Sequence, residues 1–94
     1  MQPGEVIRRP LHTEKSVADI RAHNKYHFEV DRRAGKNDVR AAIEALFPSV
    51  KVTDVNTEWV QGKPRRLGYT RGRTRDWKKA IVRLRAGDQI DIGV

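Results

Sequence analysis

The sequence predicts an α+β fold, in which a small, mostly antiparallel four-stranded sheet packs with two helices. Two segments have the apolar spacing of helices and four have the character of strands, in the order β-α-β-α-β-(long basic loop)-β. The last two strands are connected by a loop and not by a helix, so we expect them to pair as an antiparallel hairpin. The 94 residues suffice for one domain, residues 1–94, with an extended basic hairpin loop at about residues 61–76.

The first strand and the first helix are expected near the N-terminus. Residues 6–9 form a short extended run that Pro10 closes, because proline disfavours a helical conformation at the residue before it. Thr13 is suited to cap a short helix, with Glu14 in the first turn, where the helix dipole favours an acid. His23-Asn24 is expected to end this helix.

The second strand and the second helix have the clearest periodicity. From Lys25 to Val30 apolar and polar residues alternate, which is typical of a half-buried strand. After a polar connection, Asn37 or Asp38 is expected to cap a helix that Pro48 ends. The apolar positions of this helix, spaced i, i+3, i+4, i+7 and i+8, are Val39, Ala42, Ile43, Leu46 and Phe47.

Two further strands are expected in the second half of the chain. Residues 50–60 are rich in β-branched side chains, but their alternation slips, and a bulge near Thr53-Asp54 would explain the slip. The final strand runs from Trp77 to Leu84. Beyond a turn, Ile90 and Ile92 form a short tail that we expect to pack back on the body.

The positive charge is concentrated in one segment, residues 61–79. Eight of these nineteen residues are Lys or Arg and only Asp76 opposes them, so the segment carries +7 of the formal charge of +8. The rest of the chain is nearly balanced, with twelve basic and eleven acidic residues. Glycine and proline interrupt the segment, which predicts an unstructured connection of about sixteen residues. Loops of this length are usually functional or disordered.

This Arg-rich segment favours a nucleic acid as the partner. Arginine grips phosphate with two parallel hydrogen bonds, and Tyr69 with the flanking Trp59 and Trp77 adds flat surfaces suited to unpaired bases. RNA is favoured over DNA because the long helix carries little charge, only Arg40 and the preceding Lys36. The candidate RNA-binding residues are Lys36, Lys63, Arg65, Arg66, Tyr69, Arg71, Arg73, Arg75, Trp77, Lys78 and Lys79.

Simpler interpretations of these residues exist. The basic segment could be a solvated loop that only keeps the protein soluble, although solubility does not require such concentrated charge. Trp59, on a strand, also fits a position in the core or at its rim, and Trp77 fits either role.

The sequence has few features of an enzyme. It contains no cysteine, which excludes disulfides and thiolate metal sites. His12, His23 and His27 show no ligand spacing with a partner acid and are expected to be ordinary surface or rim histidines. Ser16 and Ser49 have no evident base nearby, and no glycine-rich run matches a phosphate-cradling loop. We therefore expect no catalytic residues, no metal and no cofactor.

The sequence also lacks membrane and targeting signals. No apolar run approaches the roughly 18 residues that span a bilayer. The N-terminal residues have neither the apolar stretch of a signal peptide nor the Arg- and Ser-rich helix of a transit peptide. We expect no membrane insertion, no homo-oligomer, and a location in the cytosol or inside an organelle.

Several motifs, in a fixed order, resemble one protein family. They are Pro10-Leu11-His12-Thr13-Glu14-Lys15-Ser16, Asn24-Lys25-Tyr26-x-Phe28-x-Val30, Ala42-Ile43-Glu44-x-Leu46-Phe47, Gly62-Lys63-x-Arg65-Arg66-x-Gly68 and Asp76-Trp77-Lys78-Lys79-Ala80-Ile81-Val82. Each motif is weak alone, but their order and spacing together are highly specific. Over about residues 6–92 the chain resembles the bacterial form of large-subunit ribosomal protein twenty-three, a universal ribosomal protein.

The resemblance implies a small α+β domain bound to large-subunit rRNA beside the exit of the nascent-chain tunnel, among neighbouring large-subunit ribosomal proteins. In bacterial members the long hairpin loop runs along the tunnel wall near the nascent chain, which corresponds here to residues 62–75. Members also dock the chaperone trigger factor and lie next to the site of the signal recognition particle. The key docking residue of the family is the glutamate of a Thr/Ser-Glu-Lys motif, which gives Glu14, with Lys15 and Ser16, this role here.

The sequence thus predicts a non-enzymatic structural constituent of the large ribosomal subunit. The expected location is the cytoplasmic ribosome, although a plastid ribosome fits the same residues. A free-standing RNA-binding or RNA-chaperone module that uses the same basic segment is the alternative. A small nuclease or RNA-modifying subunit would need an acid or histidine constellation that the sequence does not supply.

Overall fold

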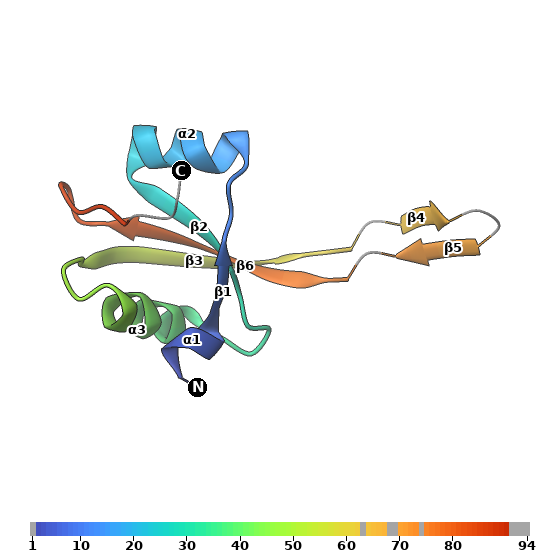
Figure 1. Cartoon of the computed structure of the whole chain (residues 1–94), viewed down its shortest axis with the longest axis horizontal. Coiled ribbons are helices and arrows are strands. Elements are labelled where there is room, and N and C mark those ends of the chain that lie inside the picture. The colour runs from blue at the N-terminus through green and yellow to red at the C-terminus, as the bar shows by residue number, and fades with distance from the viewer. Residues whose placement is uncertain (1, 63, 68–69, 74, 91–94) are drawn as a thin grey trace.

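The computed structural model describes residues 2–62, 64–67, 70–73 and 75–90, with the backbone alone described for residues 64–67 and 70–73. The elements are α1 (Pro3–Val6), β1 (Ile7–Pro10), α2 (Glu14–His23), β2 (Lys25–Val30), α3 (Lys36–Leu46), β3 (Val52–Val60), β4 (Pro64–Leu67), β5 (Thr70–Arg73) and β6 (Trp77–Leu84). Figure 1 shows a narrow arm extending from a body of helices and sheet, with principal extents of 51 × 30 × 20 Å. We call residues 61–76 the arm and the other described residues the body.

The body contains the α+β architecture that the sequence predicts. Its sheet has four antiparallel strands in the order β1-β2-β6-β3. The hairpin expected between the last two long strands is confirmed, with β3 and β6 paired from Val60 opposite Trp77 back to Val52 opposite Leu84. The register shifts between Val52 and Asp54, where the slipped alternation predicts a bulge.

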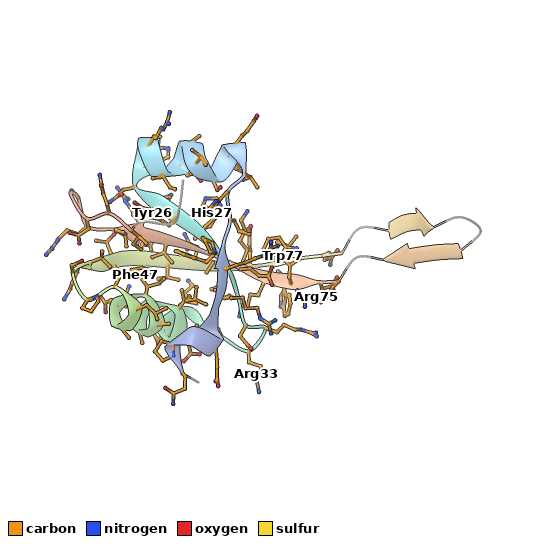
Figure 2. The ribbon with its side chains drawn as sticks, viewed as in Figure 1. Tyr26, His27, Arg33, Phe47, Arg75 and Trp77 are labelled. Atoms are coloured by element: carbon orange, nitrogen blue, oxygen red, sulfur yellow. The ribbon has the colours of Figure 1, made fainter. Side chains whose placement is uncertain are left out.

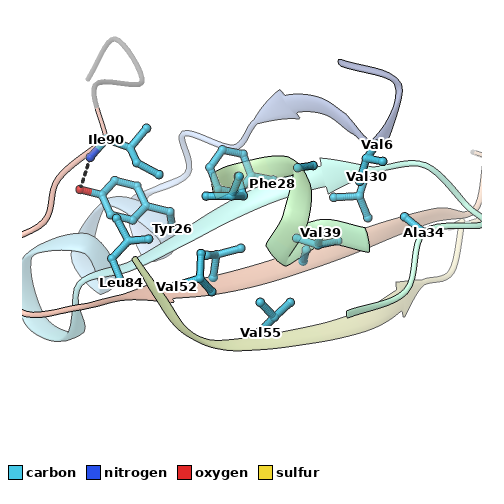
Figure 3. Close-up of a cluster of buried hydrophobic side chains, with 14 of the residues drawn as sticks. Val6, Tyr26, Phe28, Val30, Ala34, Val39, Val52, Val55, Leu84 and Ile90 are labelled. Carbon is cyan, nitrogen blue, oxygen red and sulfur yellow. Dashed lines mark hydrogen bonds between the residues drawn. The ribbon is translucent and has the colours of Figure 1, made fainter. Parts of the chain in front are cut away.

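One face of the sheet forms the hydrophobic core against α3 (Figure 3). Alternate residues of the strands point to this face, since successive side chains of a strand point to opposite sides. The tail packs back as expected: Ile90 is buried, and its N–H donates to Oη of Tyr26 at 3.2 Å. Ile92 lies outside the described residues. The central core side chains are Tyr26, Phe28, Val30, Val39, Ala42, Ile43, Val52, Val55, Ala80, Val82 and Leu84.

Helix α2 lies on the opposite side of the sheet from α3 (Figure 1). Its predicted cap is confirmed, since Oγ1 of Thr13 accepts a hydrogen bond from the N–H of Ser16 at 3.1 Å. The helix ends at the expected break, where Asn24 has the left-handed backbone conformation at φ 54°. The amide of Asn24 also donates to the carbonyl oxygens of Leu84, Arg85 and Asp88, which attaches the C-terminal turn to the end of α2.

The helices differ from the predictions at two places. The short helix α1 was not expected; the sequence feature that indicates it is the proline at its first position, where the missing N–H costs nothing. Helix α3 begins at Lys36, so neither Asn37 nor Asp38 is its cap. Asp38 acts from inside the first turn instead, because its carboxylate accepts a hydrogen bond from the N–H of Gly35 at 3.0 Å. The helix ends at Leu46, as the following proline predicts.

The arm differs most from its prediction. The connection expected to be unstructured contains β4 and β5, which pair with each other as a separate two-stranded antiparallel sheet. Glycine does not prevent this, since Gly72 lies within β5 opposite Arg65. The hairpin formed by β3 and β6 positions the two chain segments side by side, so a second ladder forms at little cost in loop closure. In the described part of the chain, no helix is long and apolar enough to cross a membrane.

Candidate nucleic-acid interface

The arm begins where β3 and β6 stop pairing (Figure 1). Just beyond the last pair, the N–H of Gly62 donates to Oδ1 of Asp76 at 2.6 Å. Asp76 is the only acid of residues 61–79, and it thus contributes to closing the neck of the arm. Beyond the neck, residues 62–75 contain six Lys or Arg residues and no acid.

Four of the candidate RNA-binding arginines lie on the paired strands of the arm. The register sets Arg66 opposite Arg71, and Pro64 opposite Arg73. Like charges directly opposite each other destabilise a strand pair, so this register favours the binding of an anion. Lys63 and Tyr69, two further candidates, lie outside the described residues. The four arginines on the strands are Arg65, Arg66, Arg71 and Arg73.

Arg75 joins the arm to the body through a buried acid. Its guanidinium lies 3.2 Å from Oε2 of Glu29, and Nε of Arg9 lies 3.0 Å from the other carboxylate oxygen. The Glu29 side chain is only 7% exposed, whereas those of Arg75 and Arg9 are 68% and 67% exposed. Glu29 therefore holds two arginines whose outer surfaces remain open to an anion. Figure 2 shows Arg75 at the base of the arm.

The lysines of the predicted site also have partners within the body. Nζ of Lys78 donates to the carbonyl oxygen of Ala34 at 2.6 Å, and Nζ of Lys79 lies 3.7 Å from a carboxylate oxygen of Glu58. Both lysines and Trp77 are half-buried at the base of the arm. These three residues thus anchor the base of the arm as well as being candidates for RNA contact. Lys36, in the first turn of α3, is exposed.

Charges of alternating sign cross the sheet on the face opposite the core. The register pairs Arg9 with Glu29, Glu29 with Lys79, and Lys79 with Glu58, one residue from each of the four strands. Opposite charges at directly paired positions stabilise a sheet. The charges of this ladder compensate one another within the sheet, whereas residues 62–75 of the arm contain no acid.

A second group of arginines, which the sequence analysis missed, lies beside the base of the arm. Arg8 lies 3.6 Å from Oδ2 of Asp31, and Nε of Arg33 lies 3.3 Å from its Oδ1. The backbone N–H of Arg33 donates to the same Oδ1 at 2.8 Å, and this hydrogen bond is the main reason that the pKa of Asp31 is lowered. Arg32 lies over the ring of Trp59, 5.6 Å from its centroid.

The signal that could have revealed this group is present in the sequence as two arginine doublets, Arg8-Arg9 and Arg32-Arg33. They are far from residues 61–79 along the chain, and each is partly balanced by nearby acids in a local count of charge. The antiparallel pairing of β1 with β2 brings the doublets together at the end of the sheet from which the arm extends.

The N-terminal end of α2 carries the three candidate docking residues. Glu14 and Lys15 are exposed, but Ser16 is 0% exposed. The hydroxyl of Ser16 accepts a hydrogen bond from the N–H of Thr13 at 2.8 Å and lies within hydrogen-bond distance of the carbonyl oxygen of Leu11. The buried side chain of Ser16 completes the capping box, whereas Glu14 and Lys15 are exposed to a partner. The docking role of these three residues stays a prediction.

The histidine prediction is wrong at one position. His27 is 2% exposed, and its Nε2 lies 2.7 Å from Oδ2 of Asp19 on α2. This hydrogen bond lowers the pKa of Asp19. The pairing was not apparent because the two residues are eight positions apart, on a helix and on the strand that follows it. The described residues contain no group of three or more His, Cys, Asp or Glu side chains that could hold a metal ion.

Comparison with known proteins agrees with the resemblance drawn from the motifs. Residues 5–92 match the family described as Ribosomal protein L23. The chain is 52% identical over 92 residues to the large ribosomal subunit protein uL23 of Roseiflexus sp. (strain RS-1). This alignment covers 98% of the chain and 96% of the relative. The chain is 49% identical over 90 residues to the protein of that name from Heliobacterium modesticaldum, with coverage of 96% and 93%. The chain belongs to the ribosomal protein L23 family.

Proposed function

We propose that the protein binds large-subunit rRNA through its arm and the base of the arm, as a structural component of the large ribosomal subunit. Membership of the ribosomal protein L23 family supports a structural and not an enzymatic role, with rRNA and other large-subunit proteins as partners. The observation that carries the proposal is the separation of charge. Residues 61–79 hold +7 of the formal +8, outside the core of the body.

The physical argument is one of electrostatics and shape. A phosphate backbone binds cations in proportion to the counterions that they displace, and the arm presents its cations on a narrow hairpin extending from the body (Figure 1). In the body, by contrast, the ladder of alternating charges sets cations opposite acids across the sheet. The arm is therefore the part of the protein that can enter an RNA groove or crevice.

The family resemblance supports a finer placement. We propose that the body lies beside the exit of the nascent-chain tunnel and that the arm follows the tunnel wall, within reach of the nascent chain. The shape is suited to this placement, because the arm extends away from both α2 and α3 (Figure 1). The body would then remain at the subunit surface, in the cytoplasmic ribosome, with α2 available to other factors.

The N-terminal end of α2 is the proposed docking point for trigger factor, near the site of the signal recognition particle. Glu14 is exposed, and the capping box formed by Thr13 and Ser16 fixes the backbone from which it projects. Glu14, Val17 and Arg21 line a shallow hollow on this helix. A rigid, exposed carboxylate is suited to meeting an arginine of a partner.

The proposal is tested by sedimenting ribosomes through a high-salt sucrose cushion and probing for this protein. We expect it to remain with the large subunit at salt concentrations that remove loosely held proteins. A protein that washes off, or that never sediments with the subunit, would instead be a free RNA-binding module.

The docking proposal needs a separate measurement on the same ribosomes. Glu14→Ala is expected to weaken cosedimentation of trigger factor while the variant protein stays in the subunit. Glu5→Ala, which removes an exposed first-turn glutamate from α1, is the matched control and is expected to leave recruitment unchanged. Equal recruitment by ribosomes carrying Glu14→Ala would contradict the docking role.

A further inference from the structure

Trp59 occupies an unusual position for a large aromatic side chain. It lies at the end of β3 nearest the arm and is 52% exposed. Leu46 is the other large hydrophobic residue that is exposed in the part of the chain that the structure describes. Trp59 thus leaves much of a flat aromatic surface in solvent, directly beside the arm.

The surroundings of this ring are strongly basic. A hollow beside it is lined by Arg8, Asp31, Arg32, Arg33 and Trp59, so three arginines face one acid. Asp31 pairs with Arg8 and Arg33, at 3.6 Å and 3.3 Å. Among the described carboxylates, none forms an ion pair with Arg32, whose guanidinium lies over the Trp59 ring instead.

We propose that Trp59 and Arg32 form a second RNA contact, separate from the arm, that holds one unpaired nucleotide. The base would stack on the Trp59 ring, with Arg32 already ordered against that ring, and Arg8 and Arg33 would bind the adjoining phosphates. This inference rests on the proposed rRNA binding and specifies the conformation of the RNA at the base of the arm: a single-stranded or bulged nucleotide.

The chemistry favours RNA over a protein partner at this surface. A protein would need to supply carboxylates for three arginines and an apolar group for the ring, whereas a nucleotide carries an anion and a flat base in one unit. The position favours RNA too, because the contact lies where β3 leads into the arm, so that an rRNA strand along the arm passes it. Arginine ordered by an aromatic ring loses less conformational freedom on binding.

The test uses the full-length protein and short single-stranded RNA. Trp59 and Trp77 are its two tryptophans, so the variant Trp77→Phe reports fluorescence from Trp59 alone. At saturation, an oligoadenylate of about twelve nucleotides is expected to quench this emission strongly. An abasic oligonucleotide with the same number of phosphates is expected to bind without comparable quenching, because it has no base to stack.

Affinity measurements separate stacking from charge. Trp59→Leu is expected to weaken binding of the oligoadenylate about tenfold, and Trp59→Phe much less, because stacking requires a ring. The dependence on salt should stay as in the parent protein. Arg32→Gln should reduce the slope of log affinity against log salt by about 0.7. Leu46→Ala, which truncates the other exposed large hydrophobic residue, is the matched control and is expected to bind as the parent does.

The outcomes distinguish this inference from the proposed function. If the parent protein binds RNA with a steep dependence on salt, but Trp59→Leu binds equally well and the emission of Trp59 is unquenched, the second contact is wrong and the arm alone binds RNA. If the parent protein fails to bind rRNA at all, the proposed function fails first. Circular dichroism shows whether the Trp59→Leu variant is folded. If that variant is unfolded, the quenching of Trp59 emission in Trp77→Phe still tests the contact.

Discussion

The body and the arm are built from the same kind of antiparallel hairpin but use it differently. In the body, β3 and β6 bury one face against α3 and pair the charges of the other face across the sheet. In the arm, β4 and β5 pair only with each other, and residues 62–75 carry six cations and no acid. The body therefore has internal interactions that determine its fold, whereas residues 62–75 of the arm carry an excess of positive charge that suits an anionic partner.

This difference separates stability from binding. An isolated two-stranded hairpin is marginally stable in water, and like charges opposite each other weaken it further. The body should therefore unfold as a unit whose stability hardly depends on the arm, while the affinity for RNA should depend mainly on the arm. Arg75 and Glu29 join the arm to the body, so a change at either residue can affect both the stability of the body and the binding of RNA.

The largest expected effect is on the core of the body. Phe28 is 2% exposed at the centre of the sheet, and Phe28→Ala should lower the free energy of unfolding by about 3–5 kcal/mol, because it leaves a cavity. Urea denaturation measures the change. The matched arm variant, Arg66→Ala, should leave the unfolding midpoint within experimental error. A similar loss of stability in both variants would show that the arm and the body fold as one unit.

The next effect concerns the link between the two regions. Glu29→Gln should destabilise the body by roughly 2 kcal/mol, since two charge-assisted hydrogen bonds to arginines are weakened. Thermal denaturation measures this loss, and Glu58→Gln on the same charge ladder is the control, because its contact with Lys79 is longer and more exposed. If Glu29→Gln were as stable as the parent protein, the buried acid would not hold the base of the arm.

A smaller effect is expected at the capping box of α2. Ser16→Ala should cost about 1 kcal/mol of stability, because the N–H of Thr13 loses its acceptor. Lys15→Ala, next to it and exposed, should change stability by a few tenths of a kcal/mol at most. Denaturant titration of the pair separates a structural role of Ser16 from a role in docking. Equal stabilities of Ser16→Ala and Lys15→Ala would contradict the capping role of Ser16.

The smallest effect is on the response to acid. The pKa values of Asp19, Asp31 and Asp88 are lowered in the folded protein, mainly by hydrogen bonds from His27, from the Arg33 backbone and from the Lys51 backbone. A lowered pKa stabilises the fold above the unfolded value of about 4, and this stabilisation is lost as the pH falls through the folded value.

The thermal stability of the body should therefore be independent of pH near neutrality, where these groups stabilise the fold fully, and should fall below about pH 4. Asp31→Asn should be less stable than the parent protein at pH 7, and the difference should vanish in acid. Residues 62–75 contain no carboxylate, so they add no acidic group to this profile. A difference between parent and Asp31→Asn that persists unchanged at low pH would exclude Asp31 as its source.

Much of the body could be predicted because its signals are local. The alternation in residues 25–30, the spacing of apolar residues in α3 and the slip near Thr53 gave the strands, the long helix and the bulge. The predictions failed where the determinant lies elsewhere in the chain. His27 is buried because α2 supplies Asp19, and β4 and β5 pair because the β3–β6 hairpin holds them side by side.

The candidate site divides in the same way. The basic arm could be predicted from charge alone, because its cations are contiguous in the sequence. Arg8 and Arg32, in contrast, become neighbours of Trp59 only through the pairing of β1 with β2 and the turn that follows β2. The burial of Ser16 was also not predictable from its motif, since the same residues fit a docking role and a capping box.

The separation of the arm from the body is tested most directly by removing the arm. Deleting residues 62–75 leaves Gln61 and Asp76 as a two-residue connection between the paired Val60 and Trp77. Replacing these two residues with Asn-Gly provides a turn that suits a hairpin. The measurement is rRNA affinity as a function of salt, with unfolding of the same protein followed by circular dichroism.

For the parent protein the slope of log affinity against log salt should be roughly −4 to −7. In the deleted protein it should be shallower by about 4, since six cations are lost, while the body still unfolds cooperatively. A full-length variant with these six residues changed to glutamine separates lost charge from lost shape and should behave like the deletion. An unchanged slope in the deleted protein would contradict the central claim that the arm, and not the body, is the main rRNA-binding element.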